Sequence, residues 1–173
     1  MAVVRLDPMA GRHIDAVRTI DRSVYPNPWS VTTWRNELAS PDRFHLVAID
    51  DETLVGHAGL LFVLDEVHVT TVAVDSARQG EGIASRLLVA LLREARRHGS
   101  RAATLEVRAS HLRAQRLYGR FGFRPVGLRR GYYSAPADDA VVMWLHDLGG
   151  TEAGARIDRV AAAARDDATR TRS

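Results

Sequence analysis

Two side chains twelve residues apart, Glu106 and Tyr118, are of the types that transfer protons in enzymes. The run from Leu105 to Arg108 predicts a strand, with Leu105 and Val107 on one face and Glu106 on the other. A carboxylate there can act as a general base, and a tyrosine hydroxyl can act as an acid. Structural roles remain open for both, because Glu106 can form a salt bridge with Arg108 and a helical tyrosine can be part of the core.

A glycine-containing loop, Arg78-Gln79-Gly80-Glu81-Gly82-Ile83-Ala84, joins a predicted strand to a predicted helix. The stretch 67–74 is rich in Val and Thr, and leucines recur at helical spacing over 82–98. Unpaired N–H groups and the dipole at a helix start favour phosphate. Gly80 and Gly82 remove side chains that would keep a pyrophosphate away from those amides. The loop therefore predicts a nucleotide phosphate site, with a ligand-free turn as the alternative.

Three phosphate-binding motifs place glycines at such a turn. A P-loop needs a lysine after its last glycine, and this chain contains no lysine. A dinucleotide-binding fingerprint needs glycine where Ser85 stands, although Glu106 lies roughly where a ribose-binding acid is expected. The third motif, Gln-x-x-Gly-x-Ala, is matched by Gln79, Gly82 and Ala84.

The composition narrows the class of protein. The 173 residues are 46% hydrophobic, which is enough for one domain with a full core. The absence of cysteine excludes disulfides, cysteine-based zinc sites and a thiol nucleophile, and the seven scattered histidines predict no metal site. The net charge of +3 is carried by 24 arginines interleaved with 21 acids, so no direct nucleic-acid binding is expected. Without a membrane-spanning run or signal peptide, a cytoplasmic protein with no membrane partner is expected.

The pattern of elements predicts a mixed α/β sheet. Strands are expected at 3–6, 44–49, 54–63, 67–74, 102–108, 123–127 and 140–145, and helices at 13–24, 31–38, 82–98 and 111–121. Ser30 and Ser110 are expected to cap the second and fourth of these helices. We expect one domain over 1–148, followed by a flexible C-terminal tail over 149–173.

This order of elements resembles the GCN5-related N-acetyltransferase (GNAT) fold, a mixed sheet of about seven strands flanked by about four helices. The resemblance covers residues 3–146 and includes the Gln-x-x-Gly-x-Ala loop. Within the superfamily the chain is most similar to the RimI-type ribosomal-protein-alanine N-acetyltransferases. The supporting strings are Asn27-Pro28-Trp29-Ser30, Leu64-Asp65-Glu66, Val72-Ala73-Val74-Asp75, Leu105-Glu106-Val107-Arg108-Ala109-Ser110, Leu117-Tyr118 and Arg129-Arg130-Gly131-Tyr132-Tyr133.

The resemblance implies a role for each matching residue. Acetyl-CoA would be the cosubstrate, with Glu106 as the general base and Tyr118 as the acid that protonates the leaving thiolate. His111 stands where the family commonly has an asparagine that contacts the coenzyme, so coenzyme binding is expected to be more sensitive to pH. The pantetheine arm would follow Val72, Ala73 and Val74, the pyrophosphate would bind Gln79, Gly80, Glu81, Gly82, Ile83 and Ala84, and the acceptor pocket would be shaped by Trp29, Tyr132 and Tyr133.

The implied reaction is acetyl transfer to the N-terminal alanine of a small-subunit ribosomal protein. Direct attack in a ternary complex is expected, since no cysteine is available for an acyl-enzyme. An α-amine has an ordinary pKa of about 8, against about 10.4 for lysine, so a moderately basic carboxylate is sufficient. The alternatives are acetylation of another N-terminus, a lysine side chain or a small-molecule amine, a non-catalytic coenzyme-A-binding module, and a dinucleotide-dependent dehydrogenase.

Overall fold

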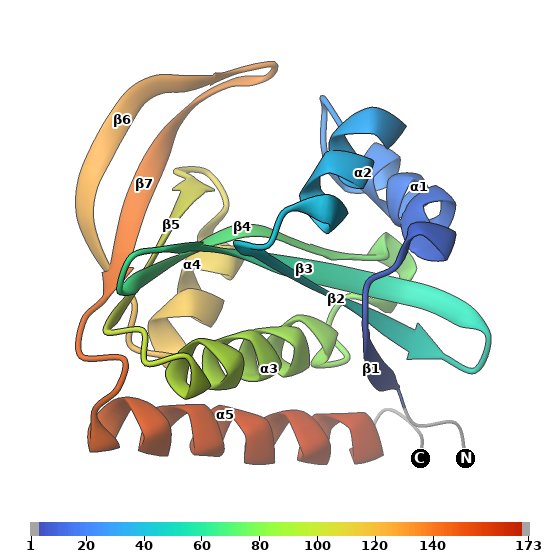
Figure 1. The fold of residues 1–173 in the computed structure, drawn as a ribbon. Helices are drawn as coiled ribbons and strands as arrows, with labels where there is room; N and C mark the ends of the chain where they lie inside the picture. The colour runs from blue at the N-terminus through green and yellow to red at the C-terminus, as the bar shows by residue number, and fades with distance from the viewer. Residues whose placement is uncertain (1–3, 171–173) are drawn as a thin grey trace.

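The computed structural model describes residues 4–170, which form one mixed sheet with helices on both faces (Figure 1). The sheet has seven strands in the order β1-β2-β3-β4-β5-β7-β6, so the expected mixed α/β sheet is confirmed. The strands are β1 Arg5–Pro8, β2 Arg43–Asp50, β3 Thr53–Val63, β4 Glu66–Val74, β5 Ala102–Arg108, β6 Arg124–Ser134 and β7 Ala137–Leu145. The α-helices of the described residues are α1 Ile14–Val24, α2 Val31–Ala39, α3 Ile83–Arg97, α4 Leu112–Arg120 and α5 Thr151–Arg170.

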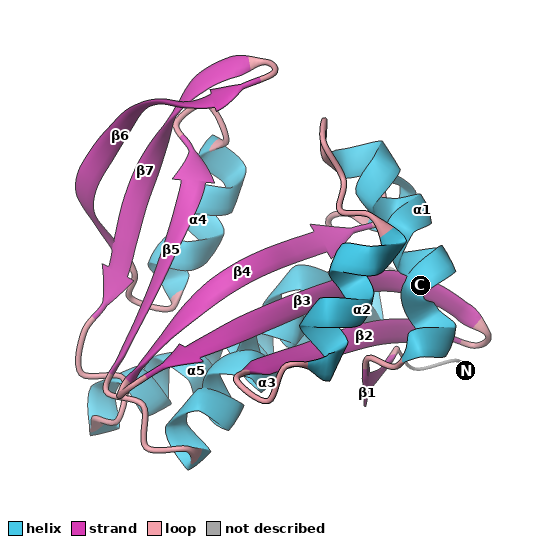
Figure 2. Ribbon diagram, turned by 45° about the horizontal axis from the view of Figure 1, so that its top comes forward, coloured by secondary structure: helices cyan, strands magenta, loops and turns pink. Residues whose placement is uncertain are grey.

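The two central strands, β4 and β5, are parallel, whereas the other neighbouring pairs are antiparallel. Their pairing covers three residue pairs and ends with His68 opposite Thr104. Beyond this point β4 continues to Val74 and β5 to Arg108, and the strands move apart (Figure 2). The sheet therefore opens at the C-terminal ends of its central strands.

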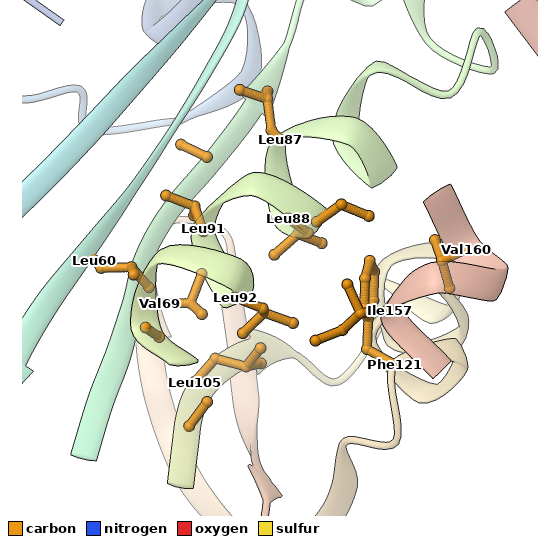
Figure 3. Packing of buried hydrophobic residues seen from close by; sticks show 14 of the residues in the cluster. Leu60, Val69, Leu87, Leu88, Leu91, Leu92, Leu105, Phe121, Ile157 and Val160 are labelled. Carbon is orange, nitrogen blue, oxygen red and sulfur yellow. The ribbon is translucent and has the colours of Figure 1, made fainter. Parts of the chain in front are cut away.

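Helix α3 provides the centre of the main core. It lies with α5 on one face of the sheet, while α1 and α2 cover the other face (Figure 1). Its leucines recur at helical spacing and are all fully buried, which confirms the periodicity seen in the sequence. Figure 3 shows how they pack between the sheet and α5, with these labelled residues in the cluster: Leu60, Val69, Leu87, Leu88, Leu91, Leu92, Leu105, Phe121, Ile157 and Val160.

The expected flexible tail is replaced by α5 over most of its length, so that expectation is corrected for Thr151–Arg170. The helix packs along α3, where Arg96 donates hydrogen bonds to the carbonyls of Leu148 and Gly150. The sequence favours a flexible tail over a short helix because Ile157 and Val160 are the two large apolar residues between 149 and 173. Alanines complete the buried stripe at helical spacing, which consists of Ala153, Ile157, Val160, Ala161 and Ala164.

The packing of α5 predicts a large loss of stability when Ile157 is truncated. Ile157 is 1% exposed in the main core. We expect Ile157→Ala to lower the free energy of unfolding by about 2–5 kcal/mol, because a cavity remains between α3 and α5. Urea denaturation measures this, with the exposed Arg159→Ala as the matched control on the same helix. Equal stabilities of the two variants would mean that α5 does not contribute to the core.

A second core joins α1 and α2 to the other face of the sheet. Trp34 is 1% exposed, and its indole Nε1 donates to Asp21 Oδ2 at 3.1 Å. Asp21 Oδ1 lies 2.6 Å from Nε2 of the buried His57 on β3. This chain of contacts fixes both helices on the sheet, and with them the loop that connects α1 to α2.

The element ends differ from the predicted ones at a few positions. Ser30 caps α2 as expected, since its Oγ accepts from the amide of Thr33 at 3.1 Å. The expected cap at Ser110 is wrong, because the N-cap of α4 is His111 and the Ser110 hydroxyl donates to Asp138. The first predicted strand starts at residue 3, which lies outside the described residues; β1 itself begins at Arg5. β6 also continues from 124 through the expected loop to 134.

Of the helices in the described range 4–170, none has both the length and the apolar character required to cross a membrane.

Candidate active site

A cavity of about 1390 Å³ lies where β4 and β5 separate. Its walls come from these two strands, the start of α3, helix α4, the hairpin of β6 and β7, and the loop after α1. Of the residues predicted for the site, Glu81 alone is not part of the lining. The lining includes Trp29, Val72, Ala73, Val74, Gln79, Gly80, Gly82, Ile83, Ala84, Glu106, His111, Tyr118, Tyr132 and Tyr133. The fold thus brings segments that are far apart in the sequence to one place.

The loop before α3 has the backbone conformation that its glycines permit. Gly80 and Gly82 have φ angles of +87° and +79°, in the left-handed region that other residues rarely adopt. Gly82 is the N-cap of α3, so the unpaired amides of the first helical turn begin beside it. The side-chain amide of Gln79 donates to the Val74 carbonyl at 3.4 Å and holds the loop against β4. This arrangement fits a bound pyrophosphate.

Glu81 has a different position from the one the resemblance implied. Its carboxylate lies 2.6 Å from Nε of Arg78, and Nη2 of Arg78 lies 2.7 Å from Asp50. The hydrogen bond with Glu81, followed by that with Asp50, raises the pKa of the Arg78 guanidinium. The Glu81 side chain is therefore engaged in fixing the loop to the end of β2.

The free edge of β4 is the second feature that fits the coenzyme. The Tyr25 hydroxyl donates to the Val72 carbonyl at 3.0 Å, whereas the Asp75 amide donates back to Val55 of β3. Because backbone groups alternate sides along a strand, those of Val72 and Val74 point away from β3, and those of Ala73 point toward it. The amides of Val72 and Val74 therefore point to the side where β5 has separated, while their carbonyls accept hydrogen bonds from Tyr25 and Gln79.

Glu106 lies in the cavity with two partners, neither of which is Arg108. Its Oε2 is 2.6 Å from Nε2 of His68, and its Oε1 is 3.6 Å from Nη2 of Arg129. Arg108, the alternative partner on the same strand, instead donates to the Pro136 carbonyl and lies over the ring of Tyr133 at 4.1 Å. The strand alternation is confirmed, since the neighbours of Glu106 on β5 are buried while its own side chain is 16% exposed.

Tyr118 lies on the cavity side of α4, and its ring packs against Phe123 at 6.0 Å between ring centroids. Burial is the main cause that raises the pKa of Tyr118 well above its ordinary value of 10.0. Nearby Tyr25 and Tyr133 raise the pKa further. The hydroxyl is therefore protonated at neutral pH and can act as a hydrogen-bond donor.

Aromatic residues form the end of the cavity that was predicted to receive the acceptor. Trp29 packs on the buried Trp34, with ring centroids 4.9 Å apart. Tyr132 and Tyr133 meet edge to face at 5.1 Å. These side chains come from the loop after α1 and from the end of β6, two segments that face each other across the open end of the sheet (Figure 2). Two apolar walls of this kind suit a narrow chain terminus.

His111 lines the cavity at the start of α4. Burial, and after it the positive charge of Arg113, lowers the pKa of His111 from its ordinary value of 6.5. The imidazole is therefore neutral at pH 7. Any change in coenzyme affinity that comes from protonation of His111 is therefore expected below pH 6.5.

Among the lining residues that the sequence does not predict for the site, His68 and Tyr25 contact predicted site residues directly. The one local signal for His68 is its place between Val67 and Val69, which puts it on the less buried face of β4. Its contact with Glu106 depends on the register between β4 and β5, which no local pattern contains. Tyr25 gives no signal at all, because its hydroxyl meets β4 only through the packing of α1 on the sheet.

Comparisons with known proteins show the family to which this chain belongs. The profile of the acetyltransferase (GNAT) family matches residues 14–123. N-alpha-acetyltransferase RimI of Mycobacterium tuberculosis is 41% identical over 121 residues, which cover 68% of this chain and 75% of that protein. The ribosomal protein bS18-alanine N-acetyltransferase of Haemophilus ducreyi is 32% identical over 130 residues, covering 73% of this chain and 89% of its own.

Among solved structures, that of the ribosomal-protein-S18-alanine N-acetyltransferase from Escherichia coli superposes with a TM-score of 0.77. The two chains are 27% identical, and the match covers 84% of this chain and 94% of the other. The sequence and the fold thus point to the same family. This chain belongs to the GNAT family and is an acetyl-CoA-dependent N-acetyltransferase.

Proposed function

We propose that this enzyme acetylates the α-amine of the N-terminal alanine of a small-subunit ribosomal protein of the bS18 type, in the cytoplasm where that protein is made. Two of the proteins named above carry this class of acceptor in their names: the Haemophilus ducreyi enzyme, which is 32% identical to this chain, and the Escherichia coli enzyme, which is 27% identical. The single structural observation that carries the proposal is the position of Glu106, in the cavity between the free edge of β4 and the aromatic walls.

The proposed coenzyme site combines the glycine loop with the free edge of β4. The amides at the start of α3 receive the pyrophosphate, and the backbone of Val72 and Val74 binds the pantetheine arm. Ala73 and Ile83, which line the cavity, are proposed to contact the pantetheine arm, and Ala84 and His111 to lie beside the pyrophosphate. Most of the rate comes from holding the amine against the thioester in one complex and from the β4 amides that stabilise the oxyanion.

Glu106 is proposed to take the proton of the acceptor amine. The amine nitrogen attacks the acetyl carbon, the carbon–sulfur bond breaks, and the electron pair leaves on sulfur. The amine proton passes to the Glu106 carboxylate, and the leaving thiolate takes its proton from the hydroxyl of Tyr118. Proton exchange with solvent then restores both side chains. An α-amine, with an ordinary pKa of about 8, is partly neutral at pH 7, so this carboxylate does not need the strength that a lysine acceptor would require.

Intact-mass analysis with acetyl-CoA and a set of peptides tests the acceptor. We expect one acetyl group on a peptide that carries the N-terminal sequence of ribosomal protein S18 and begins with alanine. The same peptide with a formylated α-amine and an internal lysine is the matched control and is expected to stay unmodified. Efficient acetylation of this control would overturn the proposal and indicate a lysine side chain as the acceptor. No acetylation of either peptide would indicate a different amine.

A further inference from the structure

The contact between His68 and Glu106 lies at the point where β4 and β5 separate. His68 is opposite Thr104 in the last pair between β4 and β5, and Glu106 lies two residues further along β5 on the same face. The strands have only begun to separate there, so the two side chains still meet across the gap, 2.6 Å between Nε2 and Oε2. Both line the cavity, and they are 32% and 16% exposed.

The two oxygens of the Glu106 carboxylate are engaged to different degrees. Oε2 is within hydrogen-bond distance of His68, and a bond of 2.6 Å to a charged acceptor is among the stronger kind. Oε1 is 3.6 Å from Nη2 of Arg129, which is too long for a hydrogen bond, and the Arg129 side chain is 57% exposed. Oε1 is therefore the oxygen that remains available to take a proton.

From this asymmetry we infer that His68 is a positioning residue for the general base: its Nε2–H holds Oε2 and thereby directs Oε1 toward the acceptor amine. The carboxylate fixes the imidazole in the tautomer that carries its proton on Nε2. His68 itself exchanges no proton with substrate, and the amine proton passes to Oε1. The inference rests on the role of Glu106 proposed above.

The expected effect of removing this contact is on turnover. A hydrogen bond to a charged group accounts for about a 10- to 100-fold change in rate when it is needed to orient that group. We expect His68→Ala to lower kcat by about this factor while the KM for acetyl-CoA changes little, since neither the glycine loop nor the edge of β4 beyond Val72 is altered. His68→Gln is expected to recover much of the loss, because its side-chain amide can still donate to Oε2.

A double-mutant cycle separates this role from a general structural one. If His68 acts only through Glu106, the loss from His68→Ala should disappear in a Glu106→Gln background, where no base remains to be oriented. The matched control is His98→Ala, since His98 pairs with Glu94 on the surface of α3 and outside the cavity. Its kcat should equal that of the wild type. Thermal unfolding of each variant verifies the fold.

Each outcome decides the inference. Wild-type kcat in His68→Ala, an equal loss in His68→Gln, or a full loss retained in the Glu106→Gln background would overturn it. The assay uses whichever amine the peptide panel shows to be acetylated, and Glu106→Gln alone tests the base. The peptide panel therefore tests the acceptor, Glu106→Gln tests the base, and the His68 variants test the positioning role, so that the failure of each can be distinguished.

Discussion

Glu106→Gln should lower kcat by about 10²–10⁴-fold, which is the usual contribution of a general base. The low end is expected because an α-amine is already partly neutral near pH 7. Glutamine keeps the shape of the side chain but cannot accept the amine proton. Affinity for acetyl-CoA should stay within a few fold, since the loop at Gly80 and Gly82 and the edge of β4 hold the coenzyme without this carboxylate.

Steady-state kinetics and calorimetry with acetyl-CoA measure the two quantities separately. Glu94→Gln is the matched control, because Glu94 pairs with Arg97 and His98 on α3 and is not part of the cavity lining. A wild-type kcat in a folded Glu106→Gln variant would remove Glu106 from the mechanism. Its contacts with His68 and Arg129 would then be structural only.

Tyr118→Phe should lower kcat by about 10²–10³-fold, the loss typical of removing a hydrogen-bond donor from a developing negative charge. Stability should change little, because within residues 4–170 no hydrogen bond to the Tyr118 hydroxyl is present and the ring contact with Phe123 remains. Thermal unfolding checks this point. Wild-type turnover in this variant would favour a packing role for the tyrosine.

The raised pKa of Tyr118 also fixes the expected pH dependence. The hydroxyl can donate only while it is protonated, and burial moves its ionisation above the ordinary value of 10.0. The wild-type and Tyr118→Phe pH profiles of kcat should therefore run parallel from pH 7 to pH 9.5. A loss of wild-type activity in that range that is absent from Tyr118→Phe would mean that Tyr118 ionises at a lower pH.

Much of the site could be predicted from the sequence because it depends on local chemistry. Glycines at 80 and 82 permit the left-handed turn that starts α3, and alternation along β5 places Glu106 on the face opposite to Leu105. Helical spacing puts Tyr118 on the cavity side of α4. Each of these features depends on a few consecutive residues within one strand, loop or helix, so the sequence is enough to predict it.

Other features were decided by contacts between distant segments. The partners of Glu106 are His68 and Arg129, from β4 and β6, and not Arg108 on its own strand. The register of β4 against β5 and the point where they separate determine which side chains meet. Helix α5 also depends on tertiary packing, because the apolar face of α3 buries its small residues. The stability that this burial provides cannot be seen in the composition of the segment. Local sequence determines which way each side chain points along its own element, whereas only the packing of the elements determines what it meets.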